Sequence, residues 1–215
     1  MVKIRIFGST ITSSRKKVGE LPTFSDLIFD RYGYHNRDEN YRGVRYCSEE
    51  RILYFLKKIK CDVAVIFHGN RYSEFCPGST EDFVDVDCGN VGFYDNIRER
   101  IPINTSMHRN TTATQMSAMI VRHRNLFYNK DLLLYRHQSA MLMIDGYLSS
   151  KNMQAIHCIN PIDIPDGFQF KSGIVDSNLK QFLITHPDQN SSNAVTAEGN
   201  RIIADSLIEY IEKLS

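Results

Sequence analysis

The sequence lacks several features that mark specialised classes of protein. It contains no tryptophan and no run of about 18 apolar residues, the length that spans a bilayer. Residues 1–10 (MVKIRIFGST) lack the apolar stretch and cleavage site of a signal peptide. Neither sign of charge dominates, with 26 Lys and Arg against 25 Asp and Glu, whereas nucleic-acid binders usually carry a basic excess. These absences predict a soluble cytoplasmic protein that binds neither membranes nor nucleic acid.

The cysteines are few and irregularly spaced. There are five, and no pair has CxxC spacing: Cys47, Cys61, Cys76, Cys88 and Cys158. An odd number without that spacing argues against a disulfide framework and against a zinc site. We therefore expect reduced thiols, as in the cytosol, and neither a metal nor another cofactor.

The remaining composition is that of an ordinary globular protein. The chain has 215 residues, of which 42% are hydrophobic and 24% charged, values typical of soluble domains. A chain of this size buries roughly 70% of its unfolded surface, enough for a core without disulfides. Because no repeat, low-complexity tract or linker divides the sequence, we predict a single domain over residues 1–215.

Segments with the patterns of strands and helices alternate along the chain. Runs typical of strands occupy residues 2–7, 63–67 (VAVIF), 153–159 (MQAIHCI) and, as a further short candidate, 182–184. Helical spacing covers residues 23–32, 48–60, 114–148 (with a break near 125–130) and 196–214. Glu49 and Glu50 suit the positive end of the second helix. The alternation predicts a three-layer α/β/α sandwich, flavodoxin-like, around a parallel sheet of about five strands, with a loop-rich insertion around 71–112.

Small and hydrogen-bonding residues lie where such a fold binds ligands. Residues 8–10 (Gly-Ser-Thr) follow the first strand, and residues 68–70 (His-Gly-Asn) follow the buried strand at 63–67. A third such loop precedes the last helix. Since open parallel sheets bind ligands outside the carboxyl ends of their strands, these three loops are the candidate site.

At these places the chain resembles the SGNH (GDSL-type) hydrolase family. The family's first block, G-D-S-x-T after a strand, corresponds to residues 8–12 (GSTIT). The resemblance implies that Thr10, at the position of the family's serine, is the nucleophile, or Ser9 if the turn is shifted by one residue. Threonine can act as a nucleophile when a base lies beside it. Alternatively, both hydroxyls only bond the backbone of the turn.

Two middle blocks of the family supply oxyanion donors. The third block, G-x-N-D, reads His68-Gly69-Asn70-Arg71 here, so Asn70 matches the donor asparagine while His68 and Arg71 replace the family's Gly and Asp. A donor of this kind stabilises the transition state by about 3–4 kcal/mol. Alternatively, Asn70 is only a turn residue. The second block of the family has a glycine ahead of a helix, and the amide of that glycine is an oxyanion donor. Gly43 is the sole glycine near this position. The resemblance implies substrate binding by Gly43, His68, Gly69 and Arg71, and by Gly8, whose following amide is a second oxyanion donor.

The last block departs from the family at its catalytic base. Members often read H-x-T-x-x-G-N, and residues 194–200 read AVTAEGN, so the register is clear but Ala194 stands at the histidine position. Alanine cannot take a proton from a nucleophile, and loss of a triad base leaves only residual activity. Three explanations stay open: a substitution introduced to arrest turnover, a natural loss in a member that only binds, or a base supplied by His186 from a longer loop.

One further motif favours a different chemistry. Asp85-Val86-Asp87 has the DxD spacing with which some glycosyltransferases hold a metal-bound nucleotide sugar, although a solvated acidic loop explains it as well. The sequence therefore predicts an SGNH-like esterase acting on an ester, such as an O-acetyl group of a glycan. The alternatives are a non-catalytic carbohydrate-binding protein with this fold and, less favoured, a metal-dependent glycosyltransferase. The oligomeric state is not predicted.

Overall fold

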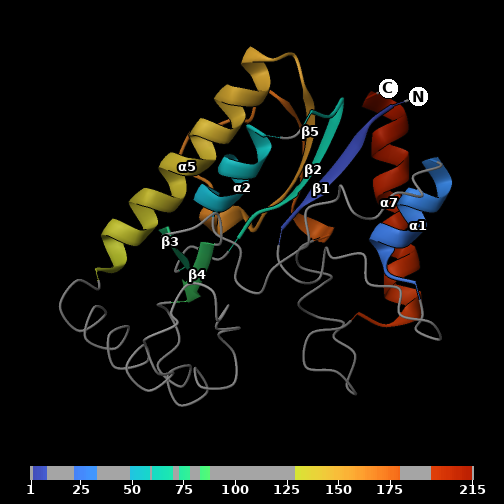
Figure 1. Cartoon of the computed structure of the whole chain (residues 1–215), viewed down its shortest axis with the longest axis horizontal. Coiled ribbons are helices and arrows are strands. Elements are labelled where there is room, and N and C mark those ends of the chain that lie inside the picture. The colour runs from blue at the N-terminus through green and yellow to red at the C-terminus, as the bar shows by residue number, and fades with distance from the viewer. Residues whose placement is uncertain are drawn as a thin grey trace, which may run out of the picture.

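The computed structural model describes residues 2–8, 22–32, 49–58, 60–69, 73–77, 83–87, 129–179 and 195–214 of the chain. These residues contain a four-stranded parallel sheet in the order β1-β2-β5-β6, with helices on both faces (Figure 1). Its strands are β1 (Ile4–Phe7), β2 (Val63–Phe67), β5 (Gln154–Cys158) and β6 (Gly173–Asp176). The helices are α1 (Phe24–Tyr32), α2 (Glu49–Leu56), α5 (Lys130–Ser150) and α7 (Ala197–Leu214), and a 3-10 turn covers Pro161–Asp163.

The two faces of the sheet bury two separate cores because side chains alternate along each strand. Ile4, Ile6 and Val65 point to the core formed with α1 and α7. Phe7 and Ile66 point to the opposite core, formed with α2 and α5. Every residue of β2 is buried, as expected of a parallel strand covered by helices on both sides. The predicted α/β sandwich is therefore confirmed.

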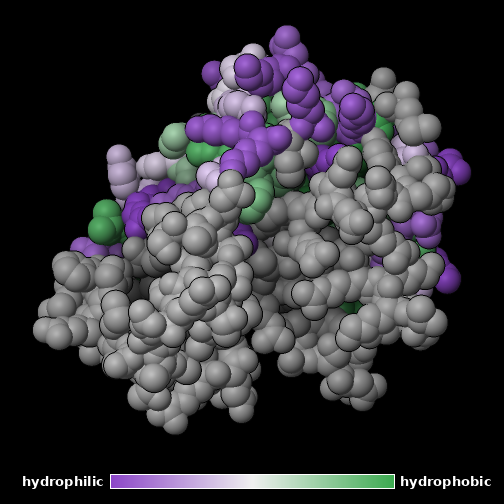
Figure 2. Space-filling model, viewed as in Figure 1, coloured by the Kyte–Doolittle hydropathy of each residue, from purple (hydrophilic) through white to green (hydrophobic). Residues whose placement is uncertain are grey.

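The register of the parallel strands aligns their carboxyl ends along one edge of the sheet. Ile4 pairs with Val63 and Phe7 with Ile66, and Phe67 pairs with Cys158 in the next strand. In Figure 1 this edge lies at the bottom of the sheet, and α2, α5 and α7 all begin at that end. The described surface around the opposite, amino edge is mostly hydrophilic (Figure 2).

Within the described residues the observed elements follow the sequence predictions closely, with two differences. The helical segment expected from residue 114 to the break near 125–130 lies outside those residues. The sheet has four strands in the described part of the chain, against the five expected, and the segment 182–184 lies outside the described residues. The fourth strand, β6, was not predicted, since its four residues are short, half-buried and begin with a glycine. Helix α5 begins where a break was expected. Asn129 caps it by accepting hydrogen bonds from the amides of Asp131 and Leu132.

Part of the expected loop-rich insertion is a β-hairpin. Strands β3 (Ser73–Pro77) and β4 (Phe83–Asp87) pair antiparallel. The rest of the segment 71–112 lies outside the described residues. Among the helices that the structure describes, none combines the length and apolarity needed to cross a membrane.

Candidate functional site

The carboxyl edge of the sheet collects the ends of β1 and β2 and the starts of several helices. The amide of Phe24, at the start of α1, donates to Oδ1 of Asn200 in the first turn of α7 at 2.9 Å. The ring of Phe24 lies 5.2 Å from that of Phe67, the last residue of β2. On the other face, Glu49 begins α2 and contacts the residues that follow β2. The topology therefore brings elements that are distant in sequence to one edge.

Glu49 contacts both of the residues that directly follow β2, His68 and Gly69. One carboxylate oxygen, Oε2, lies 2.8 Å from Nδ1 of His68, and the other, Oε1, accepts a hydrogen bond of 2.6 Å from the amide of Gly69. Burial alone would raise the pKa of this carboxyl, but the neighbouring His68, with help from His137 and the Gly69 amide, lowers it to about 2. Glu49 is therefore an ionised acceptor in the interior.

His68 continues this contact into a chain of buried polar groups. Its Nε2 lies 2.9 Å from Nδ1 of His157 in β5, and Nε2 of His157 lies 2.9 Å from Oγ of Ser172. Ser172 in turn donates to Oδ1 of Asp145 in α5 at 2.6 Å. Burial and the charge of His68 hold the pKa of His157 well below its usual value. We call Glu49, His68, His157, Ser172 and Asp145 the buried chain.

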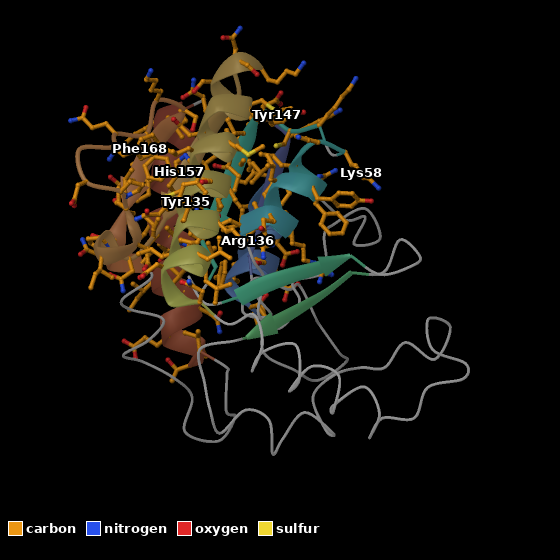
Figure 3. All side chains as sticks on the ribbon, turned by 90° about the vertical axis from the view of Figure 1, so that its left-hand side faces the viewer. Lys58, Tyr135, Arg136, Tyr147, His157 and Phe168 are labelled. Atoms are coloured by element: carbon orange, nitrogen blue, oxygen red, sulfur yellow. The ribbon has the colours of Figure 1, made fainter. Side chains whose placement is uncertain are left out.

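The buried chain is closed off by aromatic rings and by the helices that carry its ends. The ring of Phe170 lies 4.0 Å from that of His157, and Phe168 packs edge-on against Phe170 at 4.9 Å. Arg136 of α5 forms an ion pair with Glu50 of α2 at 2.7 Å, and this pair joins the two helices that carry Asp145 and Glu49. Figure 3 labels His157 and Phe168 and, on α5, Arg136.

Three of the predicted site residues lie in the described structure. Gly8 is buried directly after β1 with a φ of +151°, a backbone conformation that favours glycine. The side chain of His68 is 0% exposed, and the amide of Gly69 is occupied by Glu49. A role in substrate binding stays a prediction for all three. The other candidates lie outside the described residues: Ser9, Thr10, Gly43, Asn70, Arg71, His186 and Ala194.

The structure also describes residues of the last block and of the DxD motif. Asn200 of the last block lies in the first turn of α7 and joins it to α1, while Thr196 caps α7 by accepting a hydrogen bond from the amide of Gly199. Asp85 and Asp87 lie in β4, paired with Phe75 and Ser73. In the ranges that the structure describes, no three His, Cys, Asp or Glu side chains are arranged to hold a metal ion.

Sequence reasoning missed four members of the buried chain. Glu49 was interpreted only through the helix dipole, and His157, Ser172 and Asp145 were not singled out. The signal for His157 was present, because a histidine interrupts an otherwise apolar buried strand. A polar side chain at such a position needs a partner. The sequence did not show which residue that partner is.

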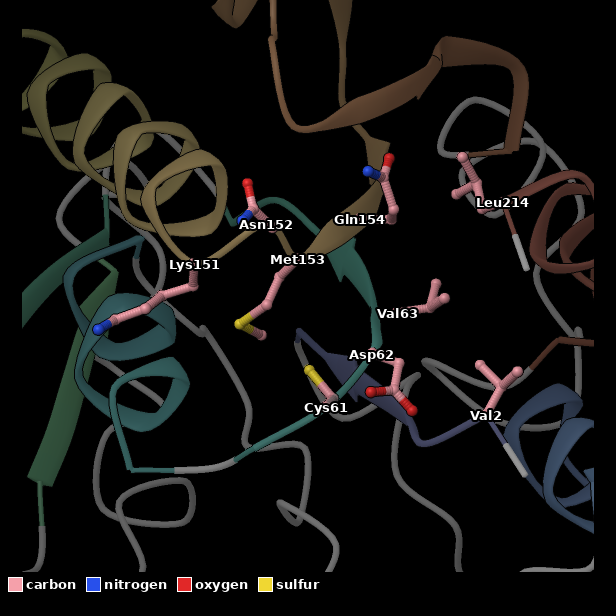
Figure 4. Close-up of a pocket in the computed structure, with 9 residues that line it drawn as sticks. All are labelled: Val2, Cys61, Asp62, Val63, Lys151, Asn152, Met153, Gln154 and Leu214. Carbon is pink, nitrogen blue, oxygen red and sulfur yellow. The ribbon is translucent and has the colours of Figure 1, made fainter.

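A cleft of about 500 Å³ lies at the opposite, amino edge of the sheet, between the ends of α5 and α7 (Figure 4). Burial raises the pKa of the Cys61 thiol there to about 12, and a carboxylate oxygen of Asp62 already accepts the amide of Lys3 at 2.7 Å. These groups are tied to the fold, so the carboxyl edge is the better candidate.

Comparison with known proteins found no match. No protein-family model matches the chain, and no curated protein or solved structure is detectably similar to it.

Proposed function

We propose that the chain is a hydrolase of the SGNH kind that acts on an ester, such as an O-acetyl group of a glycan. The observation that supports this is the pairing of β1 with β2. Phe7 lies beside Ile66, so the segment beginning at Gly8 and the segment beginning at His68 leave the same edge as neighbours. Ser9 and Thr10 follow the first in sequence, and Asn70 follows the second. A nucleophile and an oxyanion donor are required at adjacent positions.

The start of α7 supports the assignment of the last block. Val195 is buried in the core that also holds Phe24 and Phe67, and Ala194 directly precedes it in sequence. A histidine at position 194 would therefore directly precede a residue at the edge of the sheet from which the segments of the candidate nucleophile and of the candidate oxyanion donor also start.

In the proposed reaction, the hydroxyl of Thr10 or Ser9 attacks the ester carbonyl and gives its proton to the base, while Asn70 and the amide after Gly8 stabilise the oxyanion. The base returns the proton to the departing alcohol, which leaves an acyl group on the nucleophile. Water then hydrolyses this acyl intermediate, which releases the acid and restores the hydroxyl.

Ala194 favours a second candidate, a binding protein that keeps the pocket without turnover. Both candidates are tested with Ala194→His and a chromogenic acetyl ester. The control is Ala197→His, which places a histidine at an exposed position in the first turn of the same helix. Hydrolysis by Ala194→His alone supports the esterase. Hydrolysis by the unmodified chain that disappears in His186→Ala assigns the base to His186.

The opposite result is equally clear. If neither the unmodified chain nor Ala194→His releases product from any short-chain ester, the esterase proposal is wrong. Saturable binding of an acetylated oligosaccharide without turnover, measured by calorimetry on the same two proteins, would then support the binding protein.

A further inference from the structure

The protons of the buried chain can be assigned from its geometry, starting at Asp145. This carboxylate accepts hydrogen bonds from the amides of Lys171 and Ser172 and from the Ser172 hydroxyl at 2.6 Å. Ser172 has a single hydroxyl proton, and that proton points to Asp145. The Ser172 oxygen must therefore accept a hydrogen bond from Nε2 of His157.

The assignment continues through the two histidines. His157 is 0% exposed and packs against the ring of Phe170 at 4.0 Å, so burial disfavours a second ring proton on it. The carboxylate lies instead beside His68, at 2.8 Å from its Nδ1. The one ring proton of His157 therefore lies on Nε2, and its Nδ1 is an acceptor. Nε2 of His68 then donates to that Nδ1. Nδ1 of His68 donates to the ionised Glu49. His68 therefore carries both ring protons and is an imidazolium.

The same carboxylate also fixes the backbone that follows. Oε1 of Glu49 accepts a hydrogen bond from the amide of Gly69 at 2.6 Å. Two strong contacts from one buried side chain thus hold consecutive residues, His68 and Gly69, and Asn70 is next in sequence. Charge-assisted hydrogen bonds of this kind are about twice as strong as neutral ones.

We propose that Glu49 is a positioning residue, which holds His68 as an imidazolium and the Gly69 amide in place and so fixes the two residues that directly precede Asn70 in sequence. This role rests on the proposed function for its effect on catalysis, but its proton arrangement does not. In the described part of the chain, His137 of α5 also faces Glu49, at 3.9 Å between Nδ1 and Oε1. The far end of the buried chain, Asp145, keeps the neutral His157 in the tautomer that accepts from His68.

The first test is a spectroscopic one on the unmodified chain. Nitrogen-15 spectra of the imidazole rings near pH 7 should show His68 with both nitrogens protonated and His157 protonated on Nε2 alone. In Glu49→Gln, the amide group should donate to Nδ1 of His68 and its oxygen should still accept from Gly69, so His68 becomes neutral. A neutral His68 in the unmodified chain overturns the proposal, whether or not any ester is hydrolysed.

The second test is kinetic and uses Ala194→His as background. Adding Glu49→Gln should lower kcat by about 10- to 100-fold, the effect of a displaced catalytic group, and change KM by less than about threefold. The matched control is Glu50→Gln, which removes the same charge from the next residue of α2 but leaves the buried chain intact. Equal kcat values for the two variants overturn the proposal. Absence of turnover in the background overturns only the proposed function.

Discussion

Phe24 and Asn200 are 176 residues apart in sequence, yet the amide of Phe24 donates to the Asn200 side chain at 2.9 Å. The same side chain donates through Nδ2 to the carbonyl of Val195 at 2.9 Å. The buried side-chain amide of Asn200 therefore provides a hydrogen-bond partner both for a backbone amide at the start of α1 and for a backbone carbonyl just before α7. This joint places the start of α7 beside the end of β2, where the candidate site lies.

Replacing Asn200 should loosen that joint. In Asn200→Ala the buried Phe24 amide and Val195 carbonyl both lose a partner, which should lower the free energy of unfolding by about 1–3 kcal/mol. Arg201→Ala, at the next and exposed position, should change it by no more than about 0.5 kcal/mol. Urea unfolding followed by circular dichroism measures both. Equal stabilities would show that the joint contributes nothing.

Gly173 is expected to tolerate no side chain. A Cβ at this position would lie 1.9 Å from the carbonyl oxygen of Ala155 in β5, and backbone cannot move aside without breaking the pairing of β5 with β6. Gly173→Ala should therefore lose the cooperative unfolding transition or show a strongly lowered Tm. Gly146→Ala is the matched control, because no atom lies within 4 Å of its Cβ in α5. The free energy of unfolding of Gly146→Ala should be about 0.5–1 kcal/mol higher than that of the unmodified chain.

How far the sequence predicts this molecule depends on which interactions decide each part. The strand at 63–67 was predicted with the bounds that β2 has, since a continuous apolar run can only be buried on both faces. Helix α7 was predicted to within a residue from the helical spacing of apolar residues over 196–214. The sequence did not predict β6, because Gly173–Asp176 is held by Ala155 and its neighbours and has no pattern of its own.

The buried chain was missed for a related reason. Its members come from α2, the residue after β2, β5, α5 and the loop before β6. Periodicity, in contrast, only reports which face of an element is apolar. Glu49 and His68 are 19 residues apart, and His68 and His157 are 89 apart. Only the strand order places these side chains in contact. The nucleophile, the oxyanion donor and the base remain predictions from sequence.

Stability should fall in acid in two stages. The pKa of His157 is lowered from 6.5 and that of Glu49 from 4.5 to about 2, so in both cases the unfolded chain binds a proton that the folded chain does not. The free energy of unfolding should therefore decrease as the pH falls below about 6.5, and more steeply between about 4.5 and 2. Each such proton contributes a slope of about 1.4 kcal/mol per pH unit.

His157→Asn isolates the first stage. Urea unfolding at a series of pH values should give a smaller slope between pH 6.5 and 4.5 than in the unmodified chain, whatever the absolute stability of the variant. A slope that does not change would mean that His157 already binds its proton in the folded protein.

Cys61 should be unreactive in the folded protein. Burial raises the pKa of its thiol to about 12, so the thiolate that attacks alkylating reagents is scarce near neutral pH. Iodoacetamide labelling followed by peptide mapping should leave Cys61 unmodified until urea unfolds the chain. The buried Cys158 should behave in the same way. Rapid labelling of Cys61 without denaturant would contradict its placement in the core.

The most direct test of the proposed function is to trap its nucleophile. Ala194→His, treated with a fluorophosphonate ester and digested with trypsin, should carry one adduct within residues 6–15, on Thr10 or Ser9. Substitution of the labelled residue by alanine should abolish both the adduct and hydrolysis of an acetyl ester. An unlabelled Ala194→His chain, or an adduct confined to another segment, would contradict a nucleophile in the turn that follows β1.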